Sequence, residues 1–333
     1  MTDVRPKTLL AMGRQVAGRI FAGQARDRLT AVADTDPDLV ADDFDALAVA
    51  GALAEAEVLC TSWWCPPITG DVLARAPRLR AIVHAAGSVK HHVTDACWER
   101  GILVSSAAAA NAEPVAEYTL ASILFAGKRV LDIAGLYRER RASLDIEGLF
   151  PGFGNYRRTI GIVGASWIGR RVIELLRPFD LDVLVADPYL TEDLGVPHVE
   201  LDELFDRCDV ISLHAPSLPE TRHLVNAARL ARMRDGATLI NTARGALVDQ
   251  DALVAELSSG RLYAMIDVTE PEVPPADSPL YDLPNVLLTP HIAGSLGGEL
   301  GRIADLALDE LVRYARGLPF RYGIDAETLA TSA

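Results

Sequence analysis

The chain has 333 residues, of which 50% are hydrophobic and 23% charged, and its formal net charge is -14. This length favours two domains, the acidic balance disfavours a nucleic acid partner, and no apolar run approaches the roughly 20 residues that span a bilayer. The N-terminus carries no signal-peptide pattern, and the four cysteines form no CxxC pair. We therefore expect a cytoplasmic protein with free thiols, no metal and no membrane partner.

Short apolar runs alternate with helical patterns in the first third of the chain. Strands are predicted at residues 57–64, 79–85 and 101–106, and a short helix at residues 94–100. Repeated strand–helix units are typical of a parallel sheet with helices on both faces.

Residues 113–141 are predicted to form one long helix, with Pro114 in its first turn. A helix of this length commonly links two domains or joins a subunit interface. Pro151, Gly152 and Gly154 then end the helical pattern.

A second series of strands follows, at residues 159–163, 181–186, 209–214, 237–241, 262–268 and 286–288. Helices are predicted between most of these strands, and a final helix at residues 296–316. The pattern predicts an α/β fold with two doubly wound parallel-sheet domains.

The first strand of the second series runs into a glycine pattern typical of dinucleotide sites. The segment is Gly164-Ala165-Ser166-Trp167-Ile168-Gly169, which matches G-x-G-x-x-G except that Ser166 replaces the middle glycine. In this pattern the first glycine permits the tight turn and the last lets the helix pack against the strand. A plain strand-to-helix turn is the alternative, or a degenerate site in which Ser166 has abolished cofactor binding.

Asp187 follows the next strand at about the 20-residue offset expected for the acid that binds the adenosine ribose. Its carboxylate would accept both ribose hydroxyls and repel a 2′-phosphate. The sequence therefore predicts NAD, preferred over NADP, as the cofactor.

Three further strands of the series deliver Arg244, Glu272 and His291 to the edge where ligands of such sheets bind. Each has an ordinary alternative: a surface salt bridge, a solvated loop acid and a structural histidine. Together they suit the reduction of a 2-keto acid. Arginine grips a carboxylate with two donors, histidine donates a proton near neutral pH, and a neighbouring carboxylate favours the protonated imidazole.

Three stretches resemble the D-isomer-specific 2-hydroxyacid dehydrogenases, a family that includes glyoxylate or hydroxypyruvate reductases and phosphoglycerate dehydrogenases. They are ANAEPVAE at residues 110–117, NTARGALVD at 241–249 and LPNVLLTPH at 283–291. The resemblance covers nearly the whole chain, and it implies an NAD-dependent enzyme that is a homodimer.

The resemblance assigns catalysis to Arg244, Glu272 and His291. Glu272 is chosen over Glu270 because the family's acid lies five positions after the strand-end Asp267, which would hold the nicotinamide carboxamide. Further cofactor contacts are implied at His214, Ala215, Pro216, Thr221, Thr242, Ala243, Ala293 and Gly294.

The family architecture implies a Rossmann-type cofactor domain, residues 108–295, inserted into a smaller flavodoxin-like substrate domain, residues 1–107 and 296–333. The substrate carboxylate would meet the N–H groups of Gly87, Ser88 and Val89. Here the chain departs from the family, with Ser88 in place of glycine and Lys90 in place of aspartate. Lys90, His91 and His92 are predicted to form a solvated turn rather than a metal site, with a second cation near the substrate as the alternative.

The expected function is hydride transfer between NAD and C2 of a small 2-keto or 2-hydroxy acid of D configuration. One rival is a formate-dehydrogenase-like enzyme, although that class uses Gln where this chain has Glu272. Another is a non-enzymatic NAD-sensing corepressor, which can keep the same three residues. The sequence leaves the particular acid and the physiological direction open.

Overall fold

A computed structural model describes residues 5–331, which divide into two compact units. Residues 5–112 and 295–331 belong to unit 1, and residues 113–294 to unit 2. The outermost residues of the predicted substrate domain, 1–4 and 332–333, lie outside the described residues. Within the described chain, no helix is long and apolar enough to cross a membrane.

Unit 1 contains a five-stranded sheet in the order β1-β2-β3-β4-β11. Residues 34–40 extend it beyond β1 through parallel bridges to Lys7 and Leu10. With that segment counted as a strand, the parallel order is 2-1-3-4-5, the flavodoxin-like order. The parallel strands are β1 (Thr8–Ala11), β2 (Val58–Thr61), β3 (Ala81–His84) and β4 (Leu103–Ser106).

The sheet of unit 1 is not wholly parallel, because β11 (Gly323–Ile324) pairs antiparallel with β4. Alternate strand residues enter two cores, as Leu10 and Val83 do on one face and Leu9 and Ile82 on the other. The first face is covered by α1 (Arg14–Ile20), α2 (Gln24–Val32) and α13 (Leu300–Ala315), and the second by α3 (Leu47–Glu55), α4 (Gly70–Arg75) and α5 (Asp95–Glu99).

Unit 2 contains a six-stranded parallel sheet in the order β10-β9-β8-β7-β5-β6. The first strand in sequence, β5, lies between β6 and β7, so the strand order reverses there. Its strands are β5 (Thr159–Val163), β6 (Asp182–Ala186), β7 (Val210–Leu213), β8 (Thr238–Asn241), β9 (Tyr263–Ile266) and β10 (Val286–Leu288).

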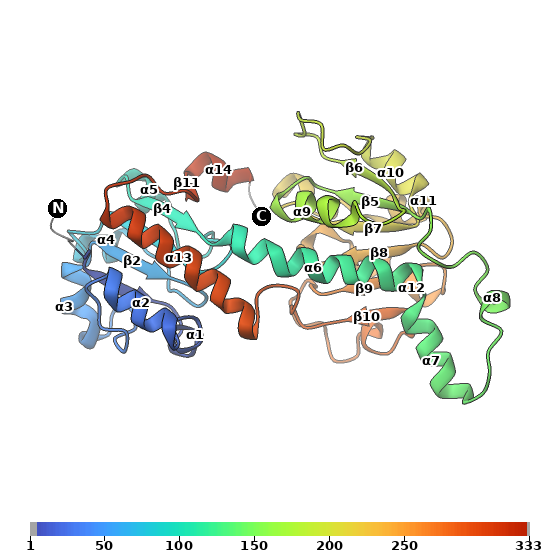
Figure 1. Ribbon diagram of the computed structural model, residues 1–333, viewed down its shortest axis with the longest axis horizontal. Helices are drawn as coiled ribbons and strands as arrows, with labels where there is room; N and C mark the ends of the chain where they lie inside the picture. Colours follow the sequence, from blue (N-terminus) through green and yellow to red (C-terminus); the bar gives the residue numbers. More distant parts are fainter. Residues whose placement is uncertain (1–4, 332–333) are drawn as a thin grey trace. The chain divides into compact units, whose positions relative to one another are not determined.

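Helices cover both faces of this sheet (Figure 1). Ile162 packs toward α6 (Ala108–Gly127) and α9 (Trp167–Leu176). Ile211 packs toward α10 (Leu201–Arg207), α11 (Ala227–Arg232) and α12 (Gln250–Ser258). The predicted α/β class with two sheets is confirmed, although most strands are shorter than predicted.

The predicted single helix over residues 113–141 is wrong at its start and in the middle, whereas its end is within one residue of the prediction. Helix α6 starts at Ala108, so Pro114 lies inside it rather than in its first turn. It ends at Gly127, whose carbonyl accepts from the N–H of Gly154, and Arg129 then adopts a left-handed φ of 51°. The helix therefore ends at a hydrogen bond from a residue 27 positions further along the chain, and a local sequence pattern could not predict that end.

After this break the chain forms α7 (Val130–Arg140) and the short α8 (Ile146–Leu149). No residue of α7 is buried, and Figure 1 shows it running out from the end of α6, away from the sheet of unit 2. The last helix, α14 (Ala326–Thr331), was not predicted. The final predicted helix is observed as α13, preceded by a 3-10 turn at Gly297–Glu299.

Candidate active site

The glycine turn of unit 2 lies at the carboxyl end of β5, next to the reversal of strand order. Gly164 has a φ of +97°, and a Cβ there would lie 2.6 Å from the backbone nitrogen of Ala215. A Cβ on Gly169 would lie 2.0 Å from the carbonyl oxygen of Gly164. Both glycines are therefore required by close backbone approach, which brings the N-terminus of α9 to the edge where open α/β sheets bind ligands.

Ser166, the departure from the glycine pattern, fits the turn without strain. Its φ is -65°, and its hydroxyl caps α9 by accepting from the N–H of Gly169 at 3.4 Å. A serine is among the preferred N-cap residues. Its hydroxyl proton can still be donated to an anion at the helix N-terminus, a position that favours negative charge.

Asp187 follows β6, beside this turn. Its Oδ2 accepts from the N–H of Ala165 at 2.6 Å and its Oδ1 from the N–H of Tyr189 at 2.8 Å. The Nε of Arg170 donates to the carbonyl of Ala165 at 2.7 Å, so the same residue is held through both its N–H and its C=O. Sequence reasoning did not find this role of Arg170, because it depends on the fold of the turn.

The ends of β7 and β8 carry the other predicted cofactor contacts. His214 is buried, its Nε2 lies 2.9 Å from the hydroxyl of Ser212, and burial lowers its pKa to about 3. The hydroxyl of Thr221 donates to the carbonyl of Pro216 at 2.7 Å, which closes the loop after β7. The hydroxyl of Thr242 lies 3.1 Å from that of Thr119.

Arg244 lies just beyond β8. The side chain of Asn241 closes the turn by donating to the carbonyl of Arg244 at 2.9 Å, and the guanidinium donates to the carbonyl of Ala243 at 2.7 Å. Burial lowers the pKa of Arg244, and the charge of Glu272 acts in the opposite direction. A Cβ on Gly245 would lie 2.1 Å from the carbonyl carbon of Thr269, so the turns after β8 and β9 pack directly together.

Glu272 and His291 form a hydrogen-bond contact at this edge, with Oε1 2.5 Å from Nδ1. Both side chains are at least half exposed, at 61% and 50%. Glu270 instead pairs with Arg222 at 3.0 Å. The structure thus brings together Glu272 and His291, and Nε2 is the ring nitrogen left to meet a ligand.

The backbone of His291 is held in a conformation that few non-glycine residues adopt, with a φ of +56°. Its N–H donates to the carbonyl of Asp267 at 2.9 Å. The buried carboxylate of Asp267 accepts from the N–H groups of Ile292 and Ala293, both at 2.8 Å, and from the hydroxyl of Thr289 at 2.6 Å. One buried acid therefore fixes the loop that presents His291.

Tyr118 extends this network, and sequence reasoning missed it. Its hydroxyl lies 3.0 Å from that of Thr289, and burial raises its pKa. No local pattern marks the residue, because its partner is far along the chain.

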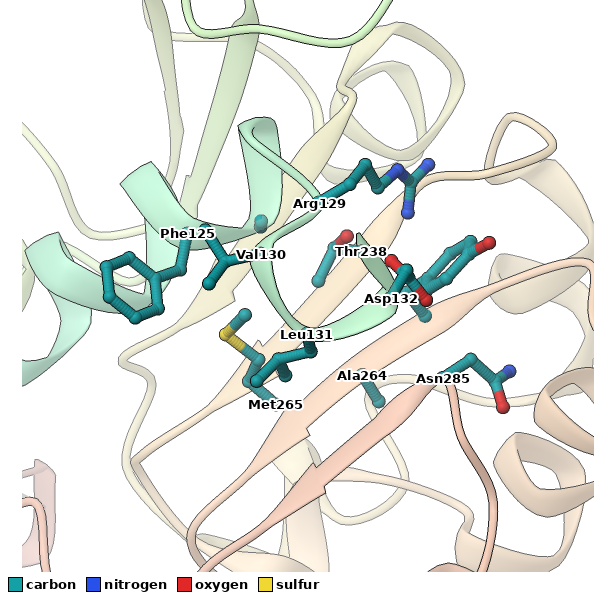
Figure 2. Close-up of a pocket in the computed structure, with 11 residues that line it drawn as sticks. Phe125, Arg129, Val130, Leu131, Asp132, Thr238, Ala264, Met265 and Asn285 are labelled. Carbon is teal, nitrogen blue, oxygen red and sulfur yellow. The ribbon is translucent and has the colours of Figure 1, made fainter. Parts of the chain in front are cut away.

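A cavity in unit 2 lies at the amino ends of the strands of the same sheet (Figure 2). It is lined by Thr238 and Tyr263, the first residues of β8 and β9, and by Arg129 and Asp132 around the helix break. Arg129 stacks over the ring of Tyr263 at 3.8 Å. Because ligands of such sheets bind at the carboxyl ends of the strands, this cavity is separate from the candidate site.

In unit 1, the residues predicted to bind the substrate carboxylate lie at the carboxyl end of β3. Among the described residues, none accepts a hydrogen bond from the N–H groups of Gly87, Ser88 or Val89. The hydroxyl of Ser106, at the end of β4, donates to the carbonyl of Gly87 at 2.7 Å and so fixes the position of the turn. Unpaired consecutive N–H groups are a common way of binding an anion.

The predicted solvated turn at Lys90, His91 and His92 is wrong for His92. Lys90 and His91 are exposed, but His92 is buried, with its Nε2 3.1 Å from the hydroxyl of Thr61. The Nδ1 of the buried His84 lies 2.9 Å from the same hydroxyl. Burial lowers the pKa of His92 to about 4 and that of His84 well below its ordinary value.

Within the described residues, no group of histidine, cysteine and acidic side chains is arranged to hold a metal. The carboxyl edge of unit 2 instead offers the N-terminus of a helix, the carboxylate of Asp187, the guanidinium of Arg244 and the imidazole of His291. These groups fit a dinucleotide at the glycine turn and an acid–base reaction at His291.

The family model for the NAD-binding domain of D-isomer-specific 2-hydroxyacid dehydrogenases matches residues 120–293. The chain is 33% identical over 298 residues to D-3-phosphoglycerate dehydrogenase of Mycobacterium tuberculosis, covering 87% of this chain and 51% of that protein. It is 34% identical to glyoxylate reductase of Korarchaeum cryptofilum, covering 75% and 77%. The chain spans about half the length of the first of these relatives. It belongs to the D-isomer-specific 2-hydroxyacid dehydrogenase family, as the resemblance predicted.

Solved structures agree with this assignment. The structure resembles D-lactate dehydrogenase of Aquifex aeolicus, complexed with NAD and lactic acid, with a TM-score of 0.73 and 30% identity over 93% of this chain and 96% of that one. It also resembles the TT0316 protein of Thermus thermophilus, with a TM-score of 0.77 and 32% identity over 95% and 99%.

Proposed function

We propose that this protein is an NAD-dependent oxidoreductase that interconverts a small 2-keto acid and the corresponding D-2-hydroxy acid. The observation that carries this proposal is the 2.5 Å contact between Glu272 and His291 at the sheet edge that also carries Arg244. The family membership and the resemblance to a D-lactate dehydrogenase support the same reaction class.

Each of the three residues has a distinct role. Glu272 holds the imidazole of His291 by its Nδ1, which leaves Nε2 to donate a proton to the carbonyl oxygen during reduction. Arg244 binds the substrate carboxylate and polarises the carbonyl, a task suited to its planar, always charged guanidinium. Bound NADH supplies the hydride, so one hydride and one proton reduce the C=O bond to a hydroxyl; oxidation is the reverse.

In unit 1, we propose that the N–H groups of Gly87, Ser88 and Val89 bind the substrate carboxylate. Their lack of acceptors among the described residues supports this role. Unit 1 is accordingly the substrate domain, and unit 2 the cofactor domain.

The cofactor proposed is NAD, in preference to NADP. Asp187 presents a carboxylate at the end of β6, where it would accept the ribose hydroxyls and repel a 2′-phosphate. Gly164, Ser166 and the N-terminus of α9 would bind the pyrophosphate. The contacts at His214, Ala215, Pro216, Thr221, Thr242, Ala243, Asp267, Ala293 and Gly294 remain proposals.

We also propose a cytoplasmic homodimer. The partly exposed apolar side chains of α7, which has no buried residue, supply a surface that a second copy would cover. Light scattering on the purified chain tests this, and a monomer at micromolar concentration would contradict it.

The function is tested by NADH oxidation at 340 nm with a panel of 2-keto acids that includes glyoxylate, pyruvate and hydroxypyruvate, with NADPH in parallel. Turnover with at least one acid and a preference for NADH is the expected result. Tight NADH binding without turnover of any acid would favour a sensor protein over an enzyme. No binding of either cofactor would contradict the proposal outright.

A further inference from the structure

The turn at Gly87, Ser88 and Val89 is closed by two buried histidines that the proposed chemistry does not use. His84 is the last residue of β3 and precedes the turn, and His92 follows it. Both imidazoles contact one hydroxyl, that of Thr61 at the end of the neighbouring strand β2, at 2.9 and 3.1 Å. Their rings lie 4.6 Å apart.

This arrangement joins the two ends of the turn through side chains. The backbone adds further bonds, because the N–H of His92 donates to the carbonyl of Val89 at 3.2 Å and the N–H of Ala85 to that of Thr61 at 2.7 Å. All three linked side chains are at most 3% exposed. The segment between the histidines is therefore fixed at both of its ends, while the N–H groups of Gly87, Ser88 and Val89 have no acceptors among the described residues.

A purely structural role would not require this polar pair. The Nε2 of His84 is buried and makes no hydrogen bond of good geometry, with only the backbone of Ser88 near it, and a poorly satisfied polar atom of this kind destabilises the folded state. Apolar side chains would fill the same space without that loss. A buried polar network is retained where it specifies a geometry, and here the specified geometry is that of the turn.

We propose that Thr61, His84 and His92 are positioning residues that hold the N–H groups of the Gly87 turn in the geometry that binds the substrate carboxylate. The inference rests on the proposed function. A turn fixed in advance loses little conformational freedom when substrate binds, so the network strengthens substrate binding without entering the reaction.

The hydroxyl of Thr61 allows a closely matched test. Thr61→Val removes the hydroxyl with little change of shape, and Thr61→Ser keeps it. We expect Thr61→Val to raise KM for the keto acid about 10-fold, with kcat changed less than about 3-fold and the Kd for NADH unchanged. Thr61→Ser should restore KM to within about 3-fold of the wild-type value. Thr35→Val, which deletes a buried hydroxyl that has no partner in the described chain, is the control and should leave KM unchanged.

The histidines offer a second pair of variants that follows which ring nitrogen makes the contact. His92 uses Nε2, which the amide of glutamine can imitate, whereas asparagine is too short to reach. His92→Gln should therefore keep KM near wild type, and His92→Asn should raise it as Thr61→Val does.

The outcomes separate this inference from the proposed function. If wild type turns over no keto acid, the proposed function fails. If wild type is active and Thr61→Val matches Thr61→Ser in KM, the positioning role is wrong. Equal losses of kcat and of NADH binding in Thr61→Val and His92→Asn, with a lowered Tm, would also overturn it, because they would show general destabilisation.

Discussion

Two histidine environments in this protein differ in almost every physical respect. His291 in unit 2 is half exposed, has a left-handed backbone and contacts a carboxylate. His84 and His92 in unit 1 are buried, share a neutral hydroxyl and have lowered pKa values. An imidazole can exchange a proton with substrate only where solvent or ligand reaches it and a partner tolerates its charge. The first environment therefore suits proton transfer, and the second suits a fixed, neutral geometry.

The largest expected effect concerns Arg244, the cation at the same sheet edge as the proposed proton donor His291. Arg244→Gln should lower kcat/KM for the keto acid about 1000-fold, roughly the 4 kcal/mol lost when a charge-assisted grip on a carboxylate is removed. Steady-state kinetics with NADH measures it. Arg222→Gln, which breaks only the exposed pair with Glu270, is the control and should change little. Equal losses in the two variants would contradict the assignment of Arg244.

The buried histidines predict acid-sensitive stability. Because the pKa of His92 is lowered to about 4, the unfolded chain binds a proton that the folded chain excludes as pH falls below about 6.5. The contribution of the neutral His92 to the free energy of unfolding is therefore complete above that pH. It decreases as the pH falls and is lost by about pH 4, which lowers the free energy of unfolding by roughly 3 kcal/mol.

Urea unfolding at a series of pH values measures this loss. His92→Gln has no imidazole to titrate, so its stability should fall less steeply between pH 6.5 and 4 than that of wild type. Parallel curves for the two proteins would show that His92 is not held neutral.

The environment of His291 could be predicted from the sequence in outline, whereas that of His92 could not. Arg244, Glu272 and His291 each follow a strand of a parallel sheet, so strand periodicity predicts that they lie at one edge, whereas the choice of Glu272 over Glu270 came from the family resemblance. The burial of His92 could not be predicted, because its partner is a hydroxyl on another strand, 31 residues earlier.

The same limit explains the errors in the fold. The end of α6 depends on a hydrogen bond from the distant Gly154. Residues 34–40 pair with β1, but they contain no alternation of apolar and polar residues from which a strand could be predicted. Gly164 and Gly169 could be predicted because neighbouring backbone atoms leave no room for a Cβ, so only glycine fits at these positions. Tyr118 left none, since a tyrosine on a helix has many ordinary roles.

A smaller effect is expected where the partner of His291 is changed. Glu272→Gln keeps the shape and a hydrogen-bond acceptor but removes the negative charge that lies 2.5 Å from the imidazole of His291, so kcat should fall about 10-fold. Glu270→Gln provides the comparison two residues away and should remain within about 2-fold of wild type. A larger loss in Glu270→Gln than in Glu272→Gln would reverse the assignment of the acid.

The smallest effect concerns cofactor choice. Asp187→Ser removes the charge proposed to repel a 2′-phosphate, and the preference for NADH over NADPH should narrow about 5-fold in kcat/KM. Asp193→Ser is the control, since Asp193 also accepts from a backbone N–H two residues on, that of Gly195, but not from the N–H of Ala165 in the glycine turn. An unchanged preference in Asp187→Ser would remove Asp187 from the cofactor site.

The central claim is that His291 donates the proton in reduction of a 2-keto acid by NADH. The most direct measurement compares wild type and His291→Ala in NADH oxidation at 340 nm with the best substrate, with NADH affinity measured by fluorescence. We expect kcat to fall roughly 100-fold or more in the variant, with the Kd for NADH unchanged. Turnover near the wild-type rate in the variant would contradict it.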